Sequence, residues 1–448
     1  MVRRFPVTRR WVLAVMVVAA GCSSQSEQVL RPPASDVSLP LAFELTHALS
    51  DKAAWFEAKI LRQHLTPEGL LAYRIDPARD QLTPTAIADM AIWSGVYLGA
   101  ESFRQRAAPS PEAHERVGTL IGGIARLESI AGEPGVLARA IMRHDAAGAF
   151  PEMEWHASGA NSDVMWMSNA SVDQLDGLLF GAGAAFDALD DGPERRQLVA
   201  TIDGIVGAMV EQGMTLRNVG GTRTKHGDLT CGWRTENLNC LIALSAVKVA
   251  HRVTGDARFA DAYQRLVQRG YPERAVAARD RWWERWTGVN HSDNNLAFLA
   301  YYNLIRYETD PRLSALYQRS LRRAWSVVRH ERNPFFTFVY HAVMPRSAWD
   351  AAALDDAKDT LLRFPTTDSR YDPDALARGC VASRLDRLNR RQACAPLPMD
   401  ERPQVAVEWN QNPARIERGT RDRAAYSGFD FLVAYWLGRA HGFIPAAA

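Results

Sequence analysis

Long apolar stretches are missing from this chain of 448 residues once its first twenty positions are passed. No later run reaches the roughly 18–20 apolar residues that a transmembrane helix needs, so we expect the remainder to be soluble. A charge excess is missing as well, because 53 Lys and Arg face 51 Asp and Glu. Four of the arginines precede residue 11, so subtracting them from +2 leaves the rest of the chain near −2. This balance gives no basis for binding nucleic acid.

Motifs for nucleotides, redox cofactors and catalytic zinc are missing too. The chain has no GxGxxG that opens a βαβ unit, no GxxxxGK[ST] phosphate loop, no GxSxG elbow and no HExxH pair. We therefore expect no cofactor and no catalytic metal. A calcium ion held by loop oxygens is the one metal that these absences leave open.

Cysteine is scarce, with five residues in all. Apart from Cys22 they form two pairs that are local in sequence, Cys231 with Cys240 and Cys380 with Cys394. In an oxidising compartment these pairs predict two loop-closing disulfides, with free thiols as the alternative. Tight CxxC or HxxxH spacing is absent, which argues against a metal site.

The N-terminus has the composition of an export signal. Four arginines precede a short apolar stretch at 11–20, which has the length of a signal-peptide core. The stretch ends in Ala19-Ala20-Gly21-Cys22, which resembles the lipobox of bacterial lipoproteins. The resemblance implies cleavage after residue 21 and lipid attachment to Cys22. An ordinary secretory peptide, with Cys22 incidental, is the alternative.

The residues after the cysteine bear on location and domain organisation. Ser23 follows Cys22 where an Asp would be an inner-membrane signal, and by resemblance to sorting in Gram-negative bacteria this favours the outer membrane. The anchored protein would face the periplasm or the outside, with the lipid as its only membrane contact. Residues 22–39 are rich in Ser, Gln and Pro and predict a disordered tether. We thus divide the chain into a signal peptide at 1–21, this tether, and one domain at 40–448.

The domain is predicted to be helical nearly throughout, because apolar residues recur at three- and four-residue spacing and β-type alternation is scarce. The predicted helices are 41–63, 84–106, 112–131, 172–189, 194–212, 236–253, 256–270, 293–307, 311–330 and 424–439, with a further helical pair at 334–362.

Short turns and long connections alternate between these helices. Turns such as 190–194 and 254–258 place Asp before Pro or Ala, which caps the next helix. Each turn joins an apolar helix to an amphipathic one, and such pairs close into a ring of inner and outer helices. About six pairs predict an all-α fold, an (α/α)6 toroid, with an open α-solenoid as the alternative. The long connections are 133–170, 213–235, 271–292 and 363–423.

Every predicted inner helix follows a long connection, so the inner N-termini should meet at one mouth of the ring. Helix N-termini offer unpaired N–H groups and partial positive charge. Polar residues recur at these starts, and although each alone would suit a helix cap, together they predict a polar cavity. Our catalytic candidates are Asp173 and Asp293, with Asp89, Asp176, Glu236 and Asp430 in reserve.

Tryptophans recur in the long connections, where an indole is costly unless it packs or binds. An indole can stack on the apolar face of a sugar ring, and stapling of the loops to the ring is the alternative. The substrate-binding candidates are Trp166, Trp233 and Trp286 for stacking, Asn237, Asn294, Tyr340 and His341 for hydroxyls, and Arg234 for a uronate.

These features together resemble the six-hairpin (α/α)6 superfamily, which includes glycoside hydrolases, unsaturated glucuronyl hydrolases, some polysaccharide lyases and sugar epimerases. Ser171-Val172-Asp173-Gln174 with Asp176-Gly177 is similar to the Ser-x-Asp-x-x-x-Gly pattern of unsaturated glucuronyl hydrolases. The resemblance implies a glycan-processing enzyme, above all a glycoside hydrolase, acting on an oligosaccharide or polysaccharide. Two alternatives stay open. One is a non-catalytic glycan binder, and the other is a lyase or epimerase whose proton carriers would be His226, His291, His341 or Tyr340.

Overall fold

The structure of the protein is a computed structural model. It describes residues 48–76, 81–148, 150–151, 153–159, 163–232, 237–279, 284, 288–366, 380–403, 405–416 and 424–446. The predicted signal peptide, the tether and Cys22 lie outside the described residues.

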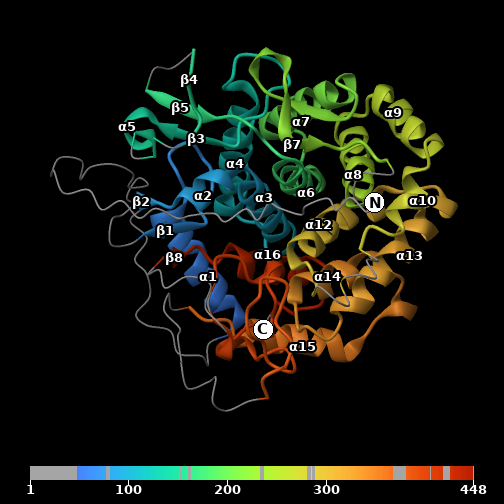
Figure 1. Cartoon of the computed structure of the whole chain (residues 1–448). Helices are drawn as coiled ribbons and strands as arrows, with labels where there is room; N and C mark the ends of the chain where they lie inside the picture. Colours follow the sequence, from blue (N-terminus) through green and yellow to red (C-terminus); the bar gives the residue numbers. More distant parts are fainter. Residues whose placement is uncertain are drawn as a thin grey trace, which may run out of the picture.

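Six buried helices form a closed ring at the centre of the protein (Figure 1). Around the ring, neighbouring helices pack in the order α3 (Met90–Ala107), α6 (Val172–Ala188), α8 (Asn237–Thr254), α12 (His291–Tyr307), α14 (Pro334–Val343) and α16 (Phe429–Ala440). Helix α16 packs against α3, so the ring closes. The all-α toroid is confirmed, and the open solenoid is excluded because its first and last helices would not touch.

A second helix covers each member of the ring. The outer helices are α4 (Pro111–Ser129), α7 (Pro193–Glu211), α9 (Ala257–Gln268), α13 (Pro311–Val328) and α15 (Ala351–Leu362), each packed on the inner helix before it, and α1 (Leu49–Lys59), packed on α16. Figure 1 shows α7, α9, α13 and α15 along the outside of the ring. Side chains in the short turns cap α4, α9 and α13; at α13 the Asp310 carboxylate accepts the N–H groups of Arg312 and Leu313. The prediction is wrong for the turn at 190–194, because α7 follows Gly192, which provides no side-chain cap.

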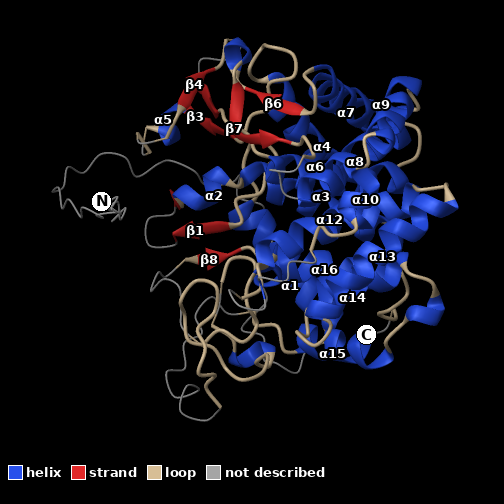
Figure 2. Cartoon of the chain, turned by 45° about the vertical axis from the view of Figure 1, so that its right-hand side comes forward, coloured by secondary structure: helices blue, strands red, loops and turns tan. Residues whose placement is uncertain are grey.

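Three small antiparallel sheets depart from the predicted helical pattern. They are β2 (Gln81–Leu82), β1 (Arg74–Asp76) and β8 (Ala425–Tyr426); β3 (Ala140–Arg143), β5 (Val164–Met167) and β4 (Trp155–Ala157); and β6 (Thr215–Arg217) with β7 (Arg223–Asp228). Figure 2 shows them along one side of the helical ring. All but β7 have four residues or fewer, at or below the shortest length over which a period-two pattern can be recognised.

Short helical segments fill the remaining connections. They are the π-helix Ile60–His64, α2 (Pro84–Ala88), α5 (His144–Ala147), α10 (Tyr271–Ala275), and the 3₁₀ turns Val219–Gly221, Arg346–Ala348, Met399–Glu401 and Glu408–Asn410.

Glycines bring α3 and α6 into backbone contact. A Cβ atom added to Gly95 of α3 would lie 2.4 Å from the carbonyl oxygen of Gly177, and one added to Gly181 of α6 would lie 2.0 Å from that of Gly95. Only residues without a side chain permit this approach. The two helices are therefore held side by side along the segment that follows their N-termini.

The inner helices share one direction around the ring. Arg106, Asp187, Arg252 and Arg306, from the last turns of α3, α6, α8 and α12, line a single cavity of about 820 Å³. Because these C-terminal ends meet at one mouth, the N-terminal ends of the same helices lie together at the opposite mouth. None of the described helices is long and apolar enough to cross a membrane.

Both predicted disulfides are present. The Cα atoms are 5.1 Å apart in Cys231–Cys240 and 5.5 Å apart in Cys380–Cys394, within the normal range for a disulfide. Cys231–Cys240 joins the connection at 213–235 to helix α8, and Cys380–Cys394 closes a loop within the connection at 363–423. The free-thiol alternative is excluded for these four residues.

Buried carboxyl groups lie at the junction of the outer helix α1 with the inner helices α3 and α16. Glu57 of α1 accepts a hydrogen bond from the Trp436 indole at 2.9 Å. It also forms an ion pair with Arg104 at 3.0 Å. Arg104 also contacts Glu101, which is fully buried, at 3.2 Å. Burial and the neighbouring Glu57 charge hold the pKa of Glu101 well above its usual range.

We predict that Glu101→Gln flattens the dependence of stability on pH. Glu101 titrates near 4.3 in the unfolded chain but higher in the folded protein, so folding takes up a proton. The contribution of Glu101 to stability is therefore complete below its unfolded pKa of about 4.3 and falls as pH rises through its higher folded-state pKa. Gln mimics the protonated acid and should remove this slope in urea unfolding. The exposed control Glu115→Gln should retain the slope, and equal slopes for all three proteins would refute the assignment.

Candidate active site

The start of α6 carries two of the predicted acids. Ser171 and Gln174 form a capping box there, which fixes where the helix begins. Asp173, in the first turn, is exposed to solvent. Asp176, less than one turn further on, is 2 % exposed, and its Oδ2 atom is buried without a hydrogen-bond partner. The α6 start thus presents one accessible and one buried carboxyl group at the mouth.

Asp89 lies at the start of the neighbouring helix α3. One of its oxygens is 3.5 Å from the Tyr73 hydroxyl, and the other is 3.7 Å from an Arg139 nitrogen. Burial raises the pKa of Asp89 to about 6, the Arg139 charge opposes the rise, and the Asp173 charge adds to it. Arg139 is held in place because its Nε atom donates to the Ala88 carbonyl at 2.8 Å.

Asp173 is the centre of an acidic cluster. Although the Asp173 side chain reaches solvent, desolvation by the surrounding protein raises its pKa most and the charge of Asp293 second, while Arg139 and His226 of β7 act in the opposite direction. The pKa of Asp176 is held well above its usual range by burial and then by the Asp173 charge. Acids from α3, α6 and α12 therefore lie within electrostatic range of one another. The predicted meeting of Asp173 and Asp293 at one mouth agrees with this coupling.

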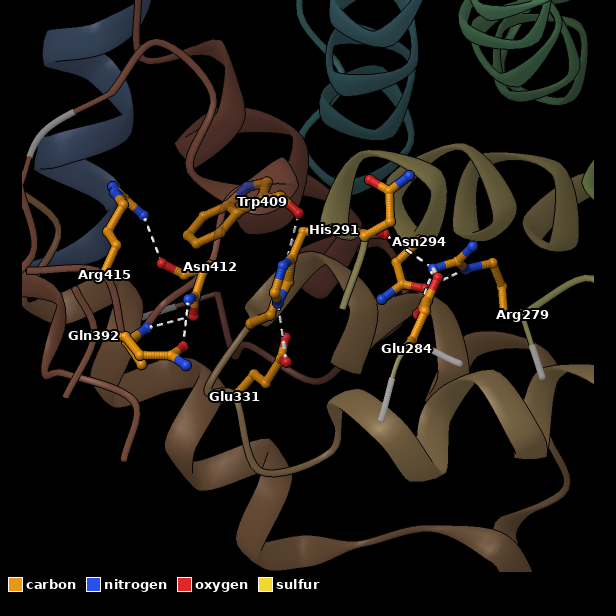
Figure 3. Close-up of polar contacts among 12 residues, drawn as sticks. Arg279, Glu284, His291, Asn294, Glu331, Gln392, Trp409, Asn412 and Arg415 are labelled. Carbon is orange, nitrogen blue, oxygen red and sulfur yellow. Dashed lines mark hydrogen bonds and ion pairs between the residues drawn. The ribbon is translucent and has the colours of Figure 1, made fainter. Parts of the chain in front are cut away.

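A buried arginine fixes the start of α12, as Figure 3 shows. Arg279 has a side chain 1 % exposed and contacts Asp293 at 3.2 Å and Glu284 at 3.0 Å. Its Nε atom donates to the side-chain oxygen of Asn294, a residue that is 2 % exposed. Opposite charges compensate the desolvation of this guanidinium. Asp293 is thereby held in one orientation at the mouth.

A cavity of about 590 Å³ extends from Asp293. Its polar wall includes His291, whose Nε2 atom is 3.0 Å from a Glu331 oxygen (Figure 3). The opposite wall comes from the long connection after α15. The residues of that wall are Arg384, Asp386, Arg387, Leu388, Arg390, Gln392, Asn410, Gln411 and Asn412. The cavity is rich in amides and charges, as a site for a hydroxylated ligand requires.

Three predicted binding residues lie inside the packing of the protein instead of at the mouth. Trp166 is 2 % exposed and stacks on His156 with ring centroids 4.5 Å apart. Tyr340 stacks on Trp325 of the outer helix α13 at 4.7 Å. In His341 both ring nitrogens are engaged, one with the Thr337 carbonyl and the other with the Asp350 N–H. These contacts give Trp166, Tyr340 and His341 structural roles.

The other candidates are distributed as follows. Asn237 begins α8 and is partly buried. Asp430, at the start of α16, is buried and accepts the Glu408 N–H at 2.8 Å, and burial raises its pKa to about 7. Trp233, Arg234, Glu236 and Trp286 lie outside the described residues.

Three residues of the mouth were not among the predicted site residues. They are Tyr73 and Arg139, which contact Asp89, and Arg279, which contacts Asp293 and holds it in place. They lie in connections that carry no helical periodicity, so only spatial proximity identifies them. Among the described residues, no group of three His, Cys, Asp or Glu side chains is arranged to hold a metal ion.

Comparisons with known proteins show a distant likeness of fold. No protein-family model matches the chain, and no curated protein matches it. Among solved structures, a GH76 α-mannanase from Bacteroides thetaiotaomicron is 9 % identical, with 89 % of this chain and 96 % of that chain covered and a TM-score of 0.46. A sugar epimerase from a ruminal bacterium is 9 % identical, with coverages of 88 % and 96 % and a TM-score of 0.44. Likenesses this distant transfer neither residues nor activity, so the chemistry rests on this chain's own side chains.

We predict that Arg139→Met raises the pKa of Asp89 further above its value of about 6, because the variant removes the cation that favours the ionised carboxylate. The titration is followed through the ¹³C resonance of the Asp89 carboxyl. Arg143→Met serves as control, since Arg143 contacts Asp145 on the surface at 3.4 Å. An unchanged Asp89 titration in Arg139→Met would contradict the geometry described for the mouth.

Proposed function

We propose that the protein is a glycan-processing enzyme, and specifically a glycoside hydrolase. The observation that carries the proposal is the position of Asp173, exposed to solvent and electrostatically coupled to three further acids at one mouth of the ring. Hydrolysis of a glycosidic bond needs two carboxyl groups in different protonation states. Crowded carboxyl groups provide this difference, because like charges in a partly buried site resist simultaneous ionisation.

The two roles are assigned to Asp173 and Asp293. Asp173, whose pKa is raised, donates its proton to the glycosidic oxygen as the bond to the anomeric carbon breaks. Asp293, oriented by Arg279, acts on the other side of the bond. It either removes a proton from the attacking water or bonds to the anomeric carbon until water replaces it. In both cases one water is consumed, and the anomer formed first, observed by ¹H NMR, distinguishes the two routes.

The surroundings of these acids suit a sugar. The 590 Å³ cavity beside Asp293 supplies amide donors and acceptors from Asn290, Asn410 and Gln411. Sugar hydroxyls need such partners to replace the water that they lose on binding. A site of this kind holds a sugar unit of the substrate next to the acid cluster.

We predict that Asp173→Asn and Asp293→Asn each lower kcat on a responsive glycan by about a thousandfold or more, because Asn neither donates nor accepts the transferred proton. Turnover is measured with a glycan panel and a reducing-end assay, and thermal unfolding checks the fold. Asp261→Asn, on the exposed side of α9, is the matched control and should retain full activity. Full activity in both site variants would disprove the assignment, and no turnover by the natural protein on any glycan would favour a binding role.

A lyase or epimerase is the second candidate, because a His and a Tyr lie beside the acids. His226 lies near enough to lower the pKa of Asp173, and the Tyr73 hydroxyl contacts Asp89. These side chains would carry a proton to and from a sugar carbon. Ultraviolet absorbance of an unsaturated product, or interconversion of the sugar with no new reducing end, separates these reactions from hydrolysis.

We also propose that the enzyme works as a lipid-anchored protein of the bacterial outer membrane, on the strength of the lipobox-like sequence that ends in Cys22. We predict that Cys22→Ala moves the protein from the membrane fraction to the soluble fraction and removes labelling by a radioactive fatty acid, because the thiol is the site of lipid attachment. Ser23→Ala should remain in the membrane fraction. A Cys22→Ala protein that stays there with its label would exclude the anchor.

A further inference from the structure

A disulfide-closed hairpin forms one wall of the cavity. Cys380 and Cys394 are joined at its base, and the Cys394 N–H donates to the Cys380 carbonyl at 2.9 Å. The next pair inward is connected as well, because the Ala382 N–H donates to the Gln392 carbonyl at 2.9 Å. A disulfide across a short loop removes much of the conformational freedom of the segment that it closes. We refer to residues 380–394 as the stapled hairpin.

The tip of the stapled hairpin is held by one carboxylate. Asp386 accepts the N–H groups of Leu388 at 2.8 Å and Arg390 at 2.9 Å, and the Arg390 side chain at 2.8 Å. These donors lower the pKa of Asp386 against the opposing effect of burial. The turn therefore keeps its shape while Arg387 and Leu388 point outward, and Leu388 is 63 % exposed.

Contacts on both sides fix the stapled hairpin against the ring. At its base the Gln392 side-chain oxygen accepts a hydrogen bond from Asn412 at 2.9 Å, and Asn412 lies beside Arg415 (Figure 3). At its tip the backbone of Arg387 approaches Gly288, where an added Cβ would lie only 2.9 Å from the Arg387 nitrogen. Gly288 precedes the start of α12, so the tip of the hairpin reaches the same mouth as Asp293.

Among the described residues that line this cavity, most charges are paired. Each carboxylate in its wall has a partner: Glu284 and Asp293 contact Arg279, Glu331 contacts His291, and Asp386 contacts Arg390. Arg387 lines the cavity and forms no ion pair with any residue that the structure describes. Leu388, which is exposed, lies next to Arg387 in the chain. Together they form an amphipathic surface, in which the leucine can contact an apolar face of a ligand and the guanidinium can bind a polar group at its edge.

We propose that Arg387 and Leu388 form a subsite for an anionic sugar unit, which carries a carboxylate or a sulfate ester. This inference rests on the proposed function, because it assigns the cavity beside Asp293 to the same glycan. The Arg387 guanidinium binds the anionic group through paired N–H···O bonds, and Leu388 contacts an apolar ring face. The stapled hairpin holds the backbone of both residues in place before the ligand arrives, which lowers the entropy lost on binding.

The subsite is tested by calorimetric binding to the mature Asp173→Asn protein, in which turnover is blocked. The probes are tetragalacturonate, the same tetrasaccharide after reduction of its carboxyl groups, and a sulfated κ-carrageenan tetrasaccharide. We expect at least one anionic probe to bind about tenfold or more tightly than the reduced tetrasaccharide, and Arg387→Ala to abolish the preference. The response to the carboxylated and the sulfated probes distinguishes the two anionic groups. Equal affinity for charged and reduced tetrasaccharides, or no binding of either anionic probe, overturns the subsite.

Controls separate this inference from the proposed function. Arg391→Ala changes an exposed arginine of the same hairpin that does not line the cavity, and it should retain the preference. The affinity of the anionic probe should fall with added salt, and less steeply in Arg387→Ala. Turnover of a glycan by the natural protein, combined with equal affinity for the charged and the reduced tetrasaccharides, would preserve the hydrolase and remove the subsite. An Arg387-dependent preference without turnover of any glycan would preserve the subsite and remove the hydrolase.

Discussion

The close contact between α3 and α6 is the constraint on which the site depends. Gly95 and Gly181 let the two backbones meet where any side chain would collide. Each helix begins at the same mouth, so this contact places the Asp89 and Asp173 carboxyl groups near enough to influence each other's ionisation. Asn303 of α12 ties the third helix to the pair by donating to the Leu179 and Phe180 carbonyls at 3.0 and 3.2 Å. The geometry of the acids is therefore a consequence of packing in the middle of the ring, one or more turns away from them.

Charge compensation decides how far these acids are perturbed. Burial alone would raise the pKa of each carboxyl group, and the neighbouring acids act in the same direction. Arg139 limits this effect at Asp89 and Asp173, while Arg279 contacts Asp293. Both arginines come from long connections and not from the ring helices. The helices thus provide the positions of the acids, and the connections adjust their protonation. Because loops vary more easily than the helical scaffold, the same scaffold can support different chemistry.

The long connections also shape the cavity in which we propose that the ligand binds. The second disulfide and the Asp386-centred turn hold a loop that has no helix of its own against the mouth. The opposite mouth is different, because the arginines there already contact Asp187 and face the negative ends of the inner helices. Both ends of the ring hold a cavity, but their charges differ. The far mouth has arginines at the C-terminal ends of the inner helices, where they offset the helix dipoles, and the near mouth has carboxyl groups at the N-terminal ends.

The sequence by itself determined the number, order and approximate limits of the ring helices and the two disulfide pairs. All of these depend on local periodicity, capping residues and the alternation of short and long connections. Tertiary structure alone decided the small sheets, the roles of Arg139 and Arg279, and the placement of the stapled hairpin, since strands of two to six residues and contacts between distant loops leave no periodic signal. It also decided that Tyr340 and His341 lie away from the mouth. Near the end of a ten-residue helix they are about 10 Å along its axis from the first turn, a distance that residue type does not reveal.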